Sequence, residues 1–366
     1  MSPSTHNLGY TETVALLAAY TGSKVFTSCP SQLVYLSSTS AWITAMLSVI
    51  PAALGVIAIY RFVDRFDGIT FQRCVELTIG KPLGKMVGLG FLSLILGMDA
   101  IALREFSAGF KSAILPETPL NAIIVLGEAV TAYTATLGLE PLGRFIAIAF
   151  LPLSILLLAI VFGAFHMELS IAELFPLWGT GAEHTVLGSV QCSSLYADIF
   201  AFALLVPYVR EEKAGQRLHA GLVSLGLSGL AMAIAIAVGM MSFTAPTLAQ
   251  MLFPVLQLAR LFLSGIFLER IEAIFVFAWL FFGSIKVAFG HWLAASLAAD
   301  IIGVKRWTAF VWPSAVITYF LAIQPENLTD LFVFQVTVLR SVGWLVAYVL
   351  PAVLLGIAGL RGIGSK

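Results

Sequence analysis

Charge is scarce in this sequence. Asp, Glu, Lys and Arg make up 11% of its 366 residues, whereas about a quarter is usual for soluble domains. Acidic and basic residues are equal in number, so the formal net charge is +0. Without a basic excess, the chain has no electrostatic attraction to a polyanion, and we expect no nucleic-acid partner.

Cysteine is rare and the common catalytic motifs are missing. The three cysteines, Cys29, Cys74 and Cys192, stand far apart and indicate no disulfide framework. The five histidines show no metal-ligand spacing. The sequence has no Walker loop, no H-E-x-x-H, no C-x-x-C pair and no nucleophile elbow. We therefore expect no catalytic residue, no metal and no cofactor, and an enzyme has almost no support.

Hydrophobic sequence, in contrast, is abundant. Apolar residues make up 59% of the chain, and the mean hydropathy is +0.97. Because apolar runs of about 20 residues mark transmembrane helices, the sequence predicts an all-α polytopic membrane protein in a lipid bilayer, with 1–366 as a single integral membrane domain. About ten transmembrane helices are expected, near 12–35, 39–60, 86–110, 119–137, 141–165, 190–208, 218–242, 269–290, 307–323 and 340–360.

The basic residues predict the orientation of these segments. With the N-terminus in the cytoplasm, thirteen basic residues fall in inside loops and three (Lys111, Arg260 and Arg340) fall outside. Such a bias satisfies the positive-inside rule with both termini cytoplasmic. The inside residues are Arg61, Arg65, Arg73, Lys81, Lys85, Arg144, Arg210, Lys213, Arg217, Lys305, Arg306, Arg361 and Lys366.

The spacing of the ten segments favours two halves of five, over about 12–165 and 190–360. An odd number of helices per half makes the second half enter the membrane in the opposite sense, so the repeat would be inverted, as in many transporters. In each half, two segments precede a long connector, 61–85 or 244–267, and three more segments follow. Both connectors are expected to form amphipathic helices at the membrane surface.

The first segment of each half is interrupted. The first contains "TGSKVFTSCP" and the sixth contains "QCSSLYADIFAFALLVP". In the first, Gly22 permits unwinding, Ser23 and Thr27 offer hydroxyl groups, and Pro30 removes a helix hydrogen bond. Unwound backbone leaves amides and carbonyls available to coordinate a small zwitterion. The alternative is a proline kink with small residues for helix packing.

Several charged residues fall inside the predicted membrane segments. Asp99 lies near the middle of 86–110, where an ionisable residue costs roughly 2.5–3.5 kcal/mol and is a functional candidate by default. Arg104 and Glu105 lie about a turn further out and are expected to pair structurally with other helices. Glu128 would be half solvated in the weak segment 119–137. Lys286 lies near the cytoplasmic end of 269–290, and we expect it to snorkel to the surface.

The outer end of segment 269–290 carries a cluster of charges. Glu269, Arg270 and Glu272 form either an ion-pair collar or part of a site. Trp279 and Phe282 are expected to be packing residues and not a ligand-binding pair.

Lys24 is the most informative charge. It lies twelve residues after Glu12, about 18 Å along a helix and near the bilayer centre. An unpaired ammonium there is costly, so we expect Asp198 as its partner, with Asp99 as second choice. Lys24 would then brace the broken helices and leave the amides beyond the break for a ligand carboxylate. A purely structural ion pair remains the alternative.

The block "FPVLQLARLFLSGIFLERIEAIFVFAWLFFGSIKVAFG" (253–290) resembles the spore-germination permease family, the membrane-embedded B subunits of endospore germinant receptors. "LFPLWGTG" (174–181) and "YADIFAFALLVPYV" (196–209) are also similar, and the likeness covers essentially the whole chain. The matching positions are Pro30, Ala41, Trp42, Pro254, Arg260, Glu269, Arg270, Ile271, Glu272, Trp279 and Lys286.

This resemblance implies an amino acid–polyamine–organocation superfamily (LeuT-like) fold, with five-plus-five inverted helices and broken helices 1 and 6. It also implies a nutrient sensor in the inner spore membrane that works with an A subunit and a lipoprotein C subunit. Transport relatives in that superfamily bind amino acids between the broken first and sixth helices. One departure is the single Gly22, where those transporters have a glycine-rich stretch, and it suggests a binder that is independent of a coupling cation.

Three functions follow from these observations. The first is a receptor subunit that senses a small amino acid or similar nutrient during spore germination. The second is a proton-coupled amino-acid permease, and the third is a structural subunit of an ion-release channel. The candidate ligand-binding residues are Thr21, Gly22, Ser23, Lys24, Thr27, Asp99, Tyr196 and Asp198, and the structural or coupling candidates are Pro30, Pro207, Arg270, Glu272 and Trp279.

Overall fold

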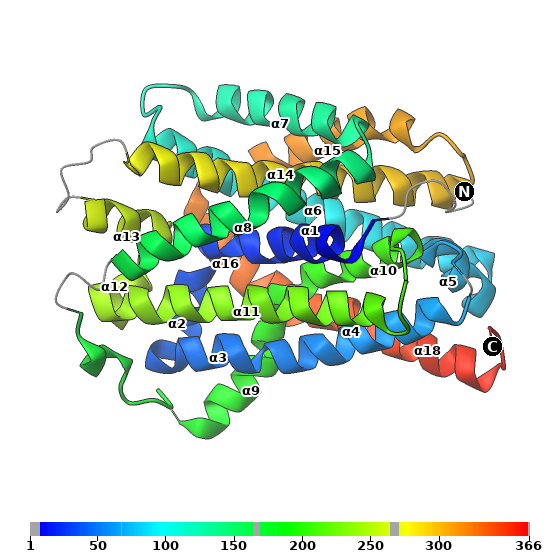
Figure 1. Ribbon diagram of the computed structural model, residues 1–366, viewed down its shortest axis with the longest axis horizontal. Helices are drawn as coiled ribbons and strands as arrows, with labels where there is room; N and C mark the ends of the chain where they lie inside the picture. The colour runs from blue at the N-terminus through cyan, green and yellow to red at the C-terminus, as the bar shows by residue number, and fades with distance from the viewer. Residues whose placement is uncertain (1–7, 67, 164–168, 180, 264–270, 365–366) are drawn as a thin grey trace.

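The computed structural model describes residues 8–66, 68–163, 169–179, 181–263 and 271–364, and helices dominate these ranges (Figure 1). Within them, the only extended pairing is one bridge between Leu8 and Val209. A helix satisfies its backbone N–H and C=O groups internally, which a chain in a bilayer requires. The prediction of an all-α protein is confirmed.

The first predicted segment is a broken helix. Helix α1 (Tyr10–Gly22) runs into a 3-10 turn, η1 (Ser23–Phe26), and the chain resumes as α2 (Cys29–Ser37). The break itself is at Thr27, whose backbone is extended (φ −104°, ψ −162°). Pro30 lies in the first turn of α2, where its missing N–H has no helical partner to lose.

The sixth predicted segment is broken as well. Helix α9 (Ala182–Cys192) gives way to the eight-residue 3-10 segment η5 (Ser193–Phe200), followed by the short helix α10 (Ala201–Leu205) and the 3-10 turn η6 (Val206–Tyr208). Runs of 3-10 helix longer than three or four residues are uncommon and often mark functional hinges. Pro207 lies in η6. Both interruptions therefore fall where the sequence predicts them.

The remaining predicted segments also coincide with helices. Two π-helical stretches, η8 just before the last segment and η9 within it, are of a rare kind that is frequent at functional sites. The helices are α3 (Ala41–Leu47), α4 (Val49–Asp64), α6 (Lys81–Ala113), α7 (Leu120–Thr136), α8 (Leu139–Gly163), α11 (Gln216–Phe243), α14 (Ile271–Ile302), α15 (Val311–Ile323), α16 (Leu328–Phe334), η8 (Gln335–Leu339), α17 (Arg340–Trp344), η9 (Leu345–Val349) and α18 (Leu350–Leu360).

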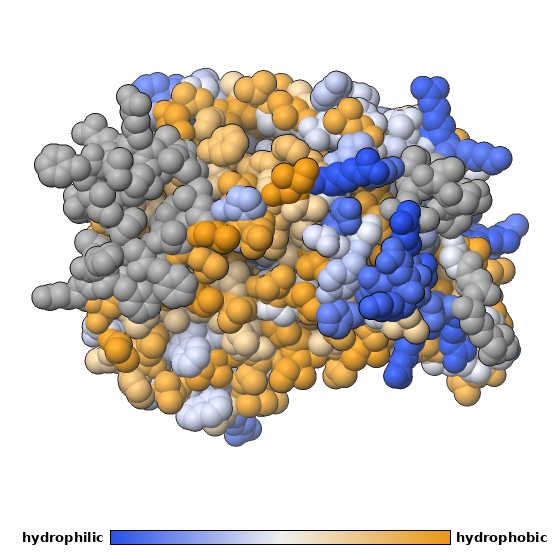
Figure 2. Space-filling model, viewed as in Figure 1, coloured by the Kyte–Doolittle hydropathy of each residue, from blue (hydrophilic) through white to orange (hydrophobic). Residues whose placement is uncertain are grey.

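Six helices in the described chain are long and apolar enough to cross a membrane. The number rises to eight if each of two sharply bent pairs counts as one span: α7 with α8, bent by 111°, and 307–323 with 328–337, bent by 106°. Figure 2 shows apolar residues over the middle of the molecule, with hydrophilic residues gathered at one end. The protein is therefore a multi-pass membrane protein, and each of its ten predicted segments contains helix in the described residues.

The two connectors contain short amphipathic helices, as expected. In 61–85, α5 (Phe71–Ile79) buries Phe71, Cys74 and Val75 against the bundle and exposes Leu77. In 244–267, α12 (Ala245–Leu248) precedes α13 (Pro254–Leu263), which buries an apolar face. Residues 264–267 of that connector lie outside the described residues.

Helices α1, α6 and α14 form the centre of the bundle. Helix α1 packs on α8, α11 and α14, and α14 packs on α6 and α7, so the long helices run side by side (Figure 1). Glycines allow the close approach of α6 to α14, because a Cβ at Gly109 would meet the Trp279 ring at 1.9 Å. This packing brings the two broken segments against α6 and α14.

Candidate functional site

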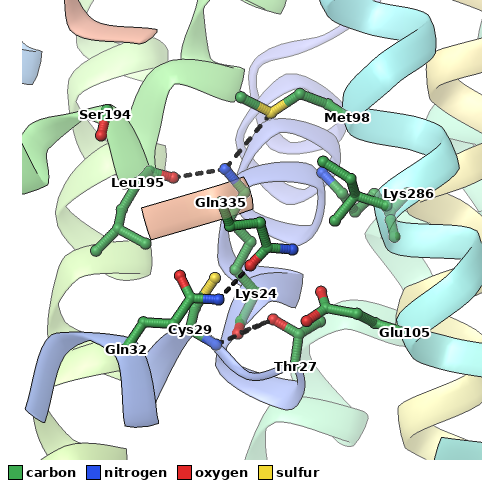
Figure 3. Close-up of a pocket in the computed structure, with 12 residues that line it drawn as sticks. Lys24, Thr27, Cys29, Gln32, Met98, Glu105, Ser194, Leu195, Lys286 and Gln335 are labelled. Atoms are coloured by element: carbon green, nitrogen blue, oxygen red, sulfur yellow. Dashed lines mark hydrogen bonds between the residues drawn. The ribbon is translucent and has the colours of Figure 1, made fainter. Parts of the chain in front are cut away.

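The broken segments meet at an ion pair. The Nζ atom of Lys24, in η1, lies 3.1 Å from Oδ2 of Asp198, in η5. The same ammonium donates to the Leu195 carbonyl at 2.6 Å and lies 3.9 Å from the Met98 sulfur (Figure 3). Asp198 is fully buried. The sequence-based choice of Asp198 as the first partner of Lys24 agrees with this geometry.

Lys286 is the second ammonium at this site, and the prediction that it snorkels to the surface is wrong. Its side chain is 2% exposed, and its Nζ lies 2.5 Å from Oδ2 of Asp198. It also donates to the Tyr20 carbonyl at 3.3 Å and lies 4.2 Å from the centroid of the Tyr20 ring. The reason is helix length: α14 runs on to Ile302, so position 286 is near its middle.

Two ammonium groups thus share one carboxylate oxygen. Oδ1 of Asp198 has no hydrogen-bond partner among the described residues. When both lysines are charged, the cluster of Lys24, Lys286 and Asp198 carries one excess positive charge in a buried setting. Because an uncompensated buried charge is costly, the site favours a further anion.

Asp99, the second predicted partner of Lys24, lies apart from this pair. It is fully buried on α6, and in the described structure neither of its oxygens has a hydrogen-bond partner. Its carboxylate rests on the α14 backbone, because a Cβ at Gly290 would meet Oδ2 at 1.9 Å. Asp99 is therefore held by packing against a glycine.

Glu105, on α6, binds the start of α2. This corrects the prediction that the amides there are left for a ligand carboxylate. Its Oε1 accepts from the Ser28 backbone N–H at 3.3 Å and from the Ser28 hydroxyl. The next amide, that of Cys29, donates to the Thr27 hydroxyl at 3.4 Å. The amides that were expected to await a ligand carboxylate are therefore already bonded within the chain. The physical cause is the positive end of α2, which attracts the nearest anion.

Two glutamines extend this network to η8, just before the last predicted membrane segment. Gln32 Nε2 donates to the Ser28 hydroxyl at 2.8 Å and to the side-chain oxygen of Gln335, in η8. The same side-chain oxygen of Gln335 also accepts from the Ser28 hydroxyl at 3.5 Å. The network therefore ties α2, α6 and the π-helical stretch η8 together.

A cavity of about 50 Å³ lies between these elements. Figure 3 shows the Lys24 ammonium and Lys286 toward its Met98 side, and Glu105 toward its Thr27 side. The cavity thus presents cations on one side and a carboxylate on the other, with apolar wall between them. Its lining residues are Lys24, Thr27, Cys29, Gln32, Met98, Ile101, Ala102, Glu105, Ser194, Leu195, Lys286 and Gln335.

Other residues expected in the site have different surroundings. Gly22 has ordinary helical backbone angles (φ −78°, ψ −19°) and allows α1 to approach Ser228 closely. The Ser23 hydroxyl donates to the Tyr20 carbonyl at 3.1 Å. These residues close the end of α1, and neither is among the cavity-lining residues of the described chain.

Thr21, Tyr196, Pro30 and Pro207 likewise are not among the lining residues of the cavity in the described chain. Thr21 is buried, and its hydroxyl has no hydrogen-bond partner in the described ranges. The Tyr196 hydroxyl donates to the Ala45 carbonyl at 3.1 Å. Together with the two prolines in the broken segments, they hold the broken segments in place without lining the cavity found among the described residues.

The predicted packing role of Trp279 agrees with the structure. It is 1% exposed, and its ring lies against Phe106, Phe253 and Phe275 at centroid distances of 5.8, 5.8 and 6.5 Å. Arg104 also binds another part of the chain, since it donates to the Pro325 carbonyl at 2.9 Å. Glu269, Arg270 and the side chain of Glu272 lie outside the described residues.

Glu128 corrects a further expectation. It is 6% exposed and not half solvated, and its Oε1 lies 3.0 Å from Nε2 of His291, which is fully buried. Helix α7 packs against α6, α14 and α15, and this contact removes the Glu128 side chain from solvent.

Sequence reasoning missed several lining residues. Gln32 and Gln335 are the amide residues of the mostly apolar runs "PSQLVYL" and "FVFQVTV", and an amide in such a run could have marked both as candidates. Met98 and Ala102 carry no such signal, because an apolar residue on a long helix is equally compatible with packing and with a cavity wall.

Comparison with known proteins agrees with this architecture. The family model described as "Spore germination protein" matches residues 11–331. Spore germination protein YndE of Bacillus subtilis (strain 168) is 24% identical over 90% of this chain and 90% of its own. Spore germination protein A2 of the same organism is 24% identical over 70% of each chain.

Solved structures share the fold. MHP1, a nucleobase-cation-symport-1 family transporter in a closed conformation with bromovinylhydantoin bound, matches with a TM-score of 0.65 at 14% identity, over 97% of this chain and 94% of the other. The manganese transporter of Eremococcus coleocola matches with a TM-score of 0.54 at 12% identity, over 94% and 78% of the two chains. The chain therefore has a transporter fold.

Proposed function

The chain belongs to the family of spore germination proteins, and on that premise we propose that it is a membrane subunit that senses a small amino acid in spore germination. The observation that carries this proposal is the cavity between the broken helices, with Lys24 and Lys286 on one side and Glu105 on the other. An α-amino acid carries both complementary charges a short distance apart.

The excess positive charge of the lysine pair favours the ligand carboxylate beside Lys24. The ligand ammonium then pairs with Glu105, which also accepts from Ser28. Hydrogen bonds to charged groups are worth about 1.5–3 kcal/mol each, so both ends contribute to affinity. This arrangement selects a zwitterion over a simple anion or cation.

The size and walls of the cavity favour a small apolar side chain. A volume of about 50 Å³ has room for a few water molecules, since one water needs roughly 10–15 Å³. The wall between the charged sides is formed by Met98, Ile101, Ala102 and Leu195. Small apolar amino acids such as alanine are therefore the first ligands to test.

Binding at this place suits a sensor because the cavity joins separate elements. Lys24 comes from η1, Leu195 from η5, Glu105 from α6 and Gln335 from η8. A ligand that pairs with both charged sides draws these elements together and favours one conformation of the bundle. The π-helical stretch η8 is a natural place for that change, because its backbone is already irregular.

We further propose that the signal passes to an A subunit and a lipoprotein C subunit in the inner spore membrane, with both termini of this chain cytoplasmic. The amphipathic helices α5 and α13 are the proposed docking surfaces. Cysteines placed along both helices test this: crosslinks to a membrane partner support docking, and their absence along both helices contradicts it.

Ligand binding is tested by thermal shift of the purified protein over amino acids, sugars and nucleosides. We expect stabilisation by small apolar amino acids, and its loss in Glu105→Gln. Glu117→Gln, which removes an exposed carboxylate, is the matched control and should respond as the unchanged protein does. Stabilisation by sugars or nucleosides alone would contradict an amino-acid ligand.

The second candidate function is a proton-coupled amino-acid permease, which the transporter fold favours. Uptake of labelled alanine into proteoliposomes separates the two functions. Accumulation driven by a proton gradient would identify a permease, whereas binding without accumulation supports a sensor.

A further inference from the structure

Three buried titratable residues lie together outside the ligand cavity. Asp99 on α6 and His291 on α14 are fully buried, and Glu128 on α7 is 6% exposed. None of the three is among the lining residues of the cavity in the described chain. The function proposed above leaves them without a role.

Their polar atoms are unsatisfied. Both nitrogens of His291 and all four carboxylate oxygens of Asp99 and Glu128 have no hydrogen-bond partner among the described residues. Nε2 of His291 lies 3.0 Å from Oε1 of Glu128, which is an ion-pair distance. Asp99 rests on Gly290, the residue next to His291.

An ionised carboxylate in such a place is costly, because burial removes its hydration and no donor replaces it. Protonation removes that cost, and a carboxyl group is then a neutral acid. An imidazole beside a carboxyl group is a common arrangement for proton transfer, and His291 and Glu128 have that arrangement. A cluster of this composition is suited to binding a proton and passing it on.

Charged groups around Asp99 link it to the ligand site. Asp99 interacts electrostatically with Lys286, Asp198 and Glu128, and also with the phenol of Tyr20 on α1. Asp99 is therefore close enough to the charges of Lys286 and Asp198 for a change of charge at the ligand site to alter the cost of ionising it.

Helices α15 and α8 add no competing charge. Helix α15 packs on α6, α7 and α14 and buries Ser314 and Thr318, which do not titrate in the physiological range. Helix α8, which also packs on α14, carries Glu140 and Arg144, and these pair with each other at its start.

We propose that Asp99, Glu128 and His291 form a proton-binding site coupled to the ligand cavity; this coupling rests on the proposed function. A ligand carboxylate that pairs with Lys24 places a negative charge on the Asp99 side of the cavity, which favours the protonated form of Asp99. Asp99 then takes up one proton, which forms an O–H bond on its carboxylate. Glu128 and His291 pass that proton on and are themselves reprotonated from water.

Water has a route toward this site. A second cavity, of about 260 Å³, lies where α7 meets α8 and is lined by Ser296 and Trp292 of α14. The Ser296 hydroxyl is buried and has no hydrogen-bond partner in the part of the chain that the structure describes. Ser296 lies about 7.5 Å along α14 from His291, so this cavity lies close to the proposed proton site.

The first test follows protons during alanine binding, by calorimetry in two buffers with different ionisation enthalpies. We expect uptake of about one proton by the unchanged protein, and affinity that rises about tenfold for each unit of pH decrease while Asp99 is ionised in the empty state. Asp99→Asn should still bind alanine, with little proton uptake and a flat pH profile. Glu117→Gln should behave like the unchanged protein. Alanine binding without proton uptake, or uptake that persists in Asp99→Asn, would overturn the coupling.

The second test needs no ligand and so separates this proposal from the proposed function. Infrared difference spectra of the ligand-free protein should show a protonated-carboxyl band that grows on acidification and is missing in Asp99→Asn. His291→Gln should move the pH at which the band appears. A titrating band without alanine binding would leave the proton site intact and contradict the amino-acid sensor. Spectra identical in Asp99→Asn and the unchanged protein would overturn the proton site.

Discussion

Lys286 and Asp198 are joined by a contact of 2.5 Å between Nζ and Oδ2, although 88 residues separate them in the sequence. Lys24 reaches the same oxygen at 3.1 Å. The pairing connects α14 to both broken segments, so any movement of η1 relative to η5 changes the environment of a buried charge. The predictions below start from this arrangement.

Lys24→Met is expected to abolish alanine binding while the protein still inserts and folds. Lys286 continues to neutralise Asp198 in this variant, so no buried charge is left alone, whereas the ligand carboxylate loses its partner. Alanine-dependent thermal shift and size-exclusion profiles measure the two outcomes. If the double variant Lys24→Met and Asp198→Asn binds alanine normally, the pair is only structural and the ligand site lies elsewhere.

Asp198→Asn is expected to destabilise the fold more than Lys24→Met does. It leaves two buried ammonium groups without a counter-ion, and breaking a buried pair in this way costs about 3–5 kcal/mol. The melting temperature of each variant in detergent ranks the variants by stability. Adding Lys286→Met to Asp198→Asn should recover part of the loss, and no recovery would contradict the shared-oxygen arrangement.

Gly109→Ala is expected to destabilise the contact between α6 and α14. The new Cβ would meet the Trp279 ring at 1.9 Å, and overpacking of this kind costs about 1–3 kcal/mol, more than the helix-propensity gain of up to about 1 kcal/mol. Gly90→Ala on the same helix is the control, since nothing in the described chain lies within 4 Å of its Cβ position. Thermal melts should show a loss only for Gly109→Ala.

The cysteines are expected to differ in their reaction with a small thiol reagent. Burial raises the pKa of the Cys74 thiol to about 12, so this thiol stays protonated and unreactive at neutral and mildly alkaline pH. Cys29 lines the ligand cavity, and alanine should slow its modification. Mass spectrometry after timed labelling measures both rates. Rapid modification of Cys74 in the folded protein, or no protection of Cys29 by alanine, would contradict this assignment.

A reporter fused after Lys366 is expected to read as cytoplasmic. The motivation is the excess of basic residues in the predicted inside loops, and Figure 1 places the start of α1 and the end of α18 at the same end of the molecule. A periplasmic-type reporter and a cytoplasmic-type reporter at this position give opposite signals. An external reading would contradict the predicted orientation.

Local sequence was sufficient to locate the helices and their breaks. A run of about 20 apolar residues has no other stable structure in a bilayer, so the ten segments follow from hydropathy. The breaks near Thr27 and in Ser193–Phe200 follow from proline, small residues and buried charge within a few positions of each other. Lys24 and Asp198 pair as expected because each is too deep to be left alone.

Only the tertiary structure decided which faces of these helices meet. Sequence position gives the depth of Lys286 and Glu105 along their helices but not the length of α14 or the rotation of α6. The length of α14 holds Lys286 at Asp198 instead of at the surface. The rotation of α6 places Glu105 on the positive end of α2, where a ligand carboxylate was expected. Contacts between residues far apart in the chain depend on the packing of all the helices together, and no local pattern encodes them.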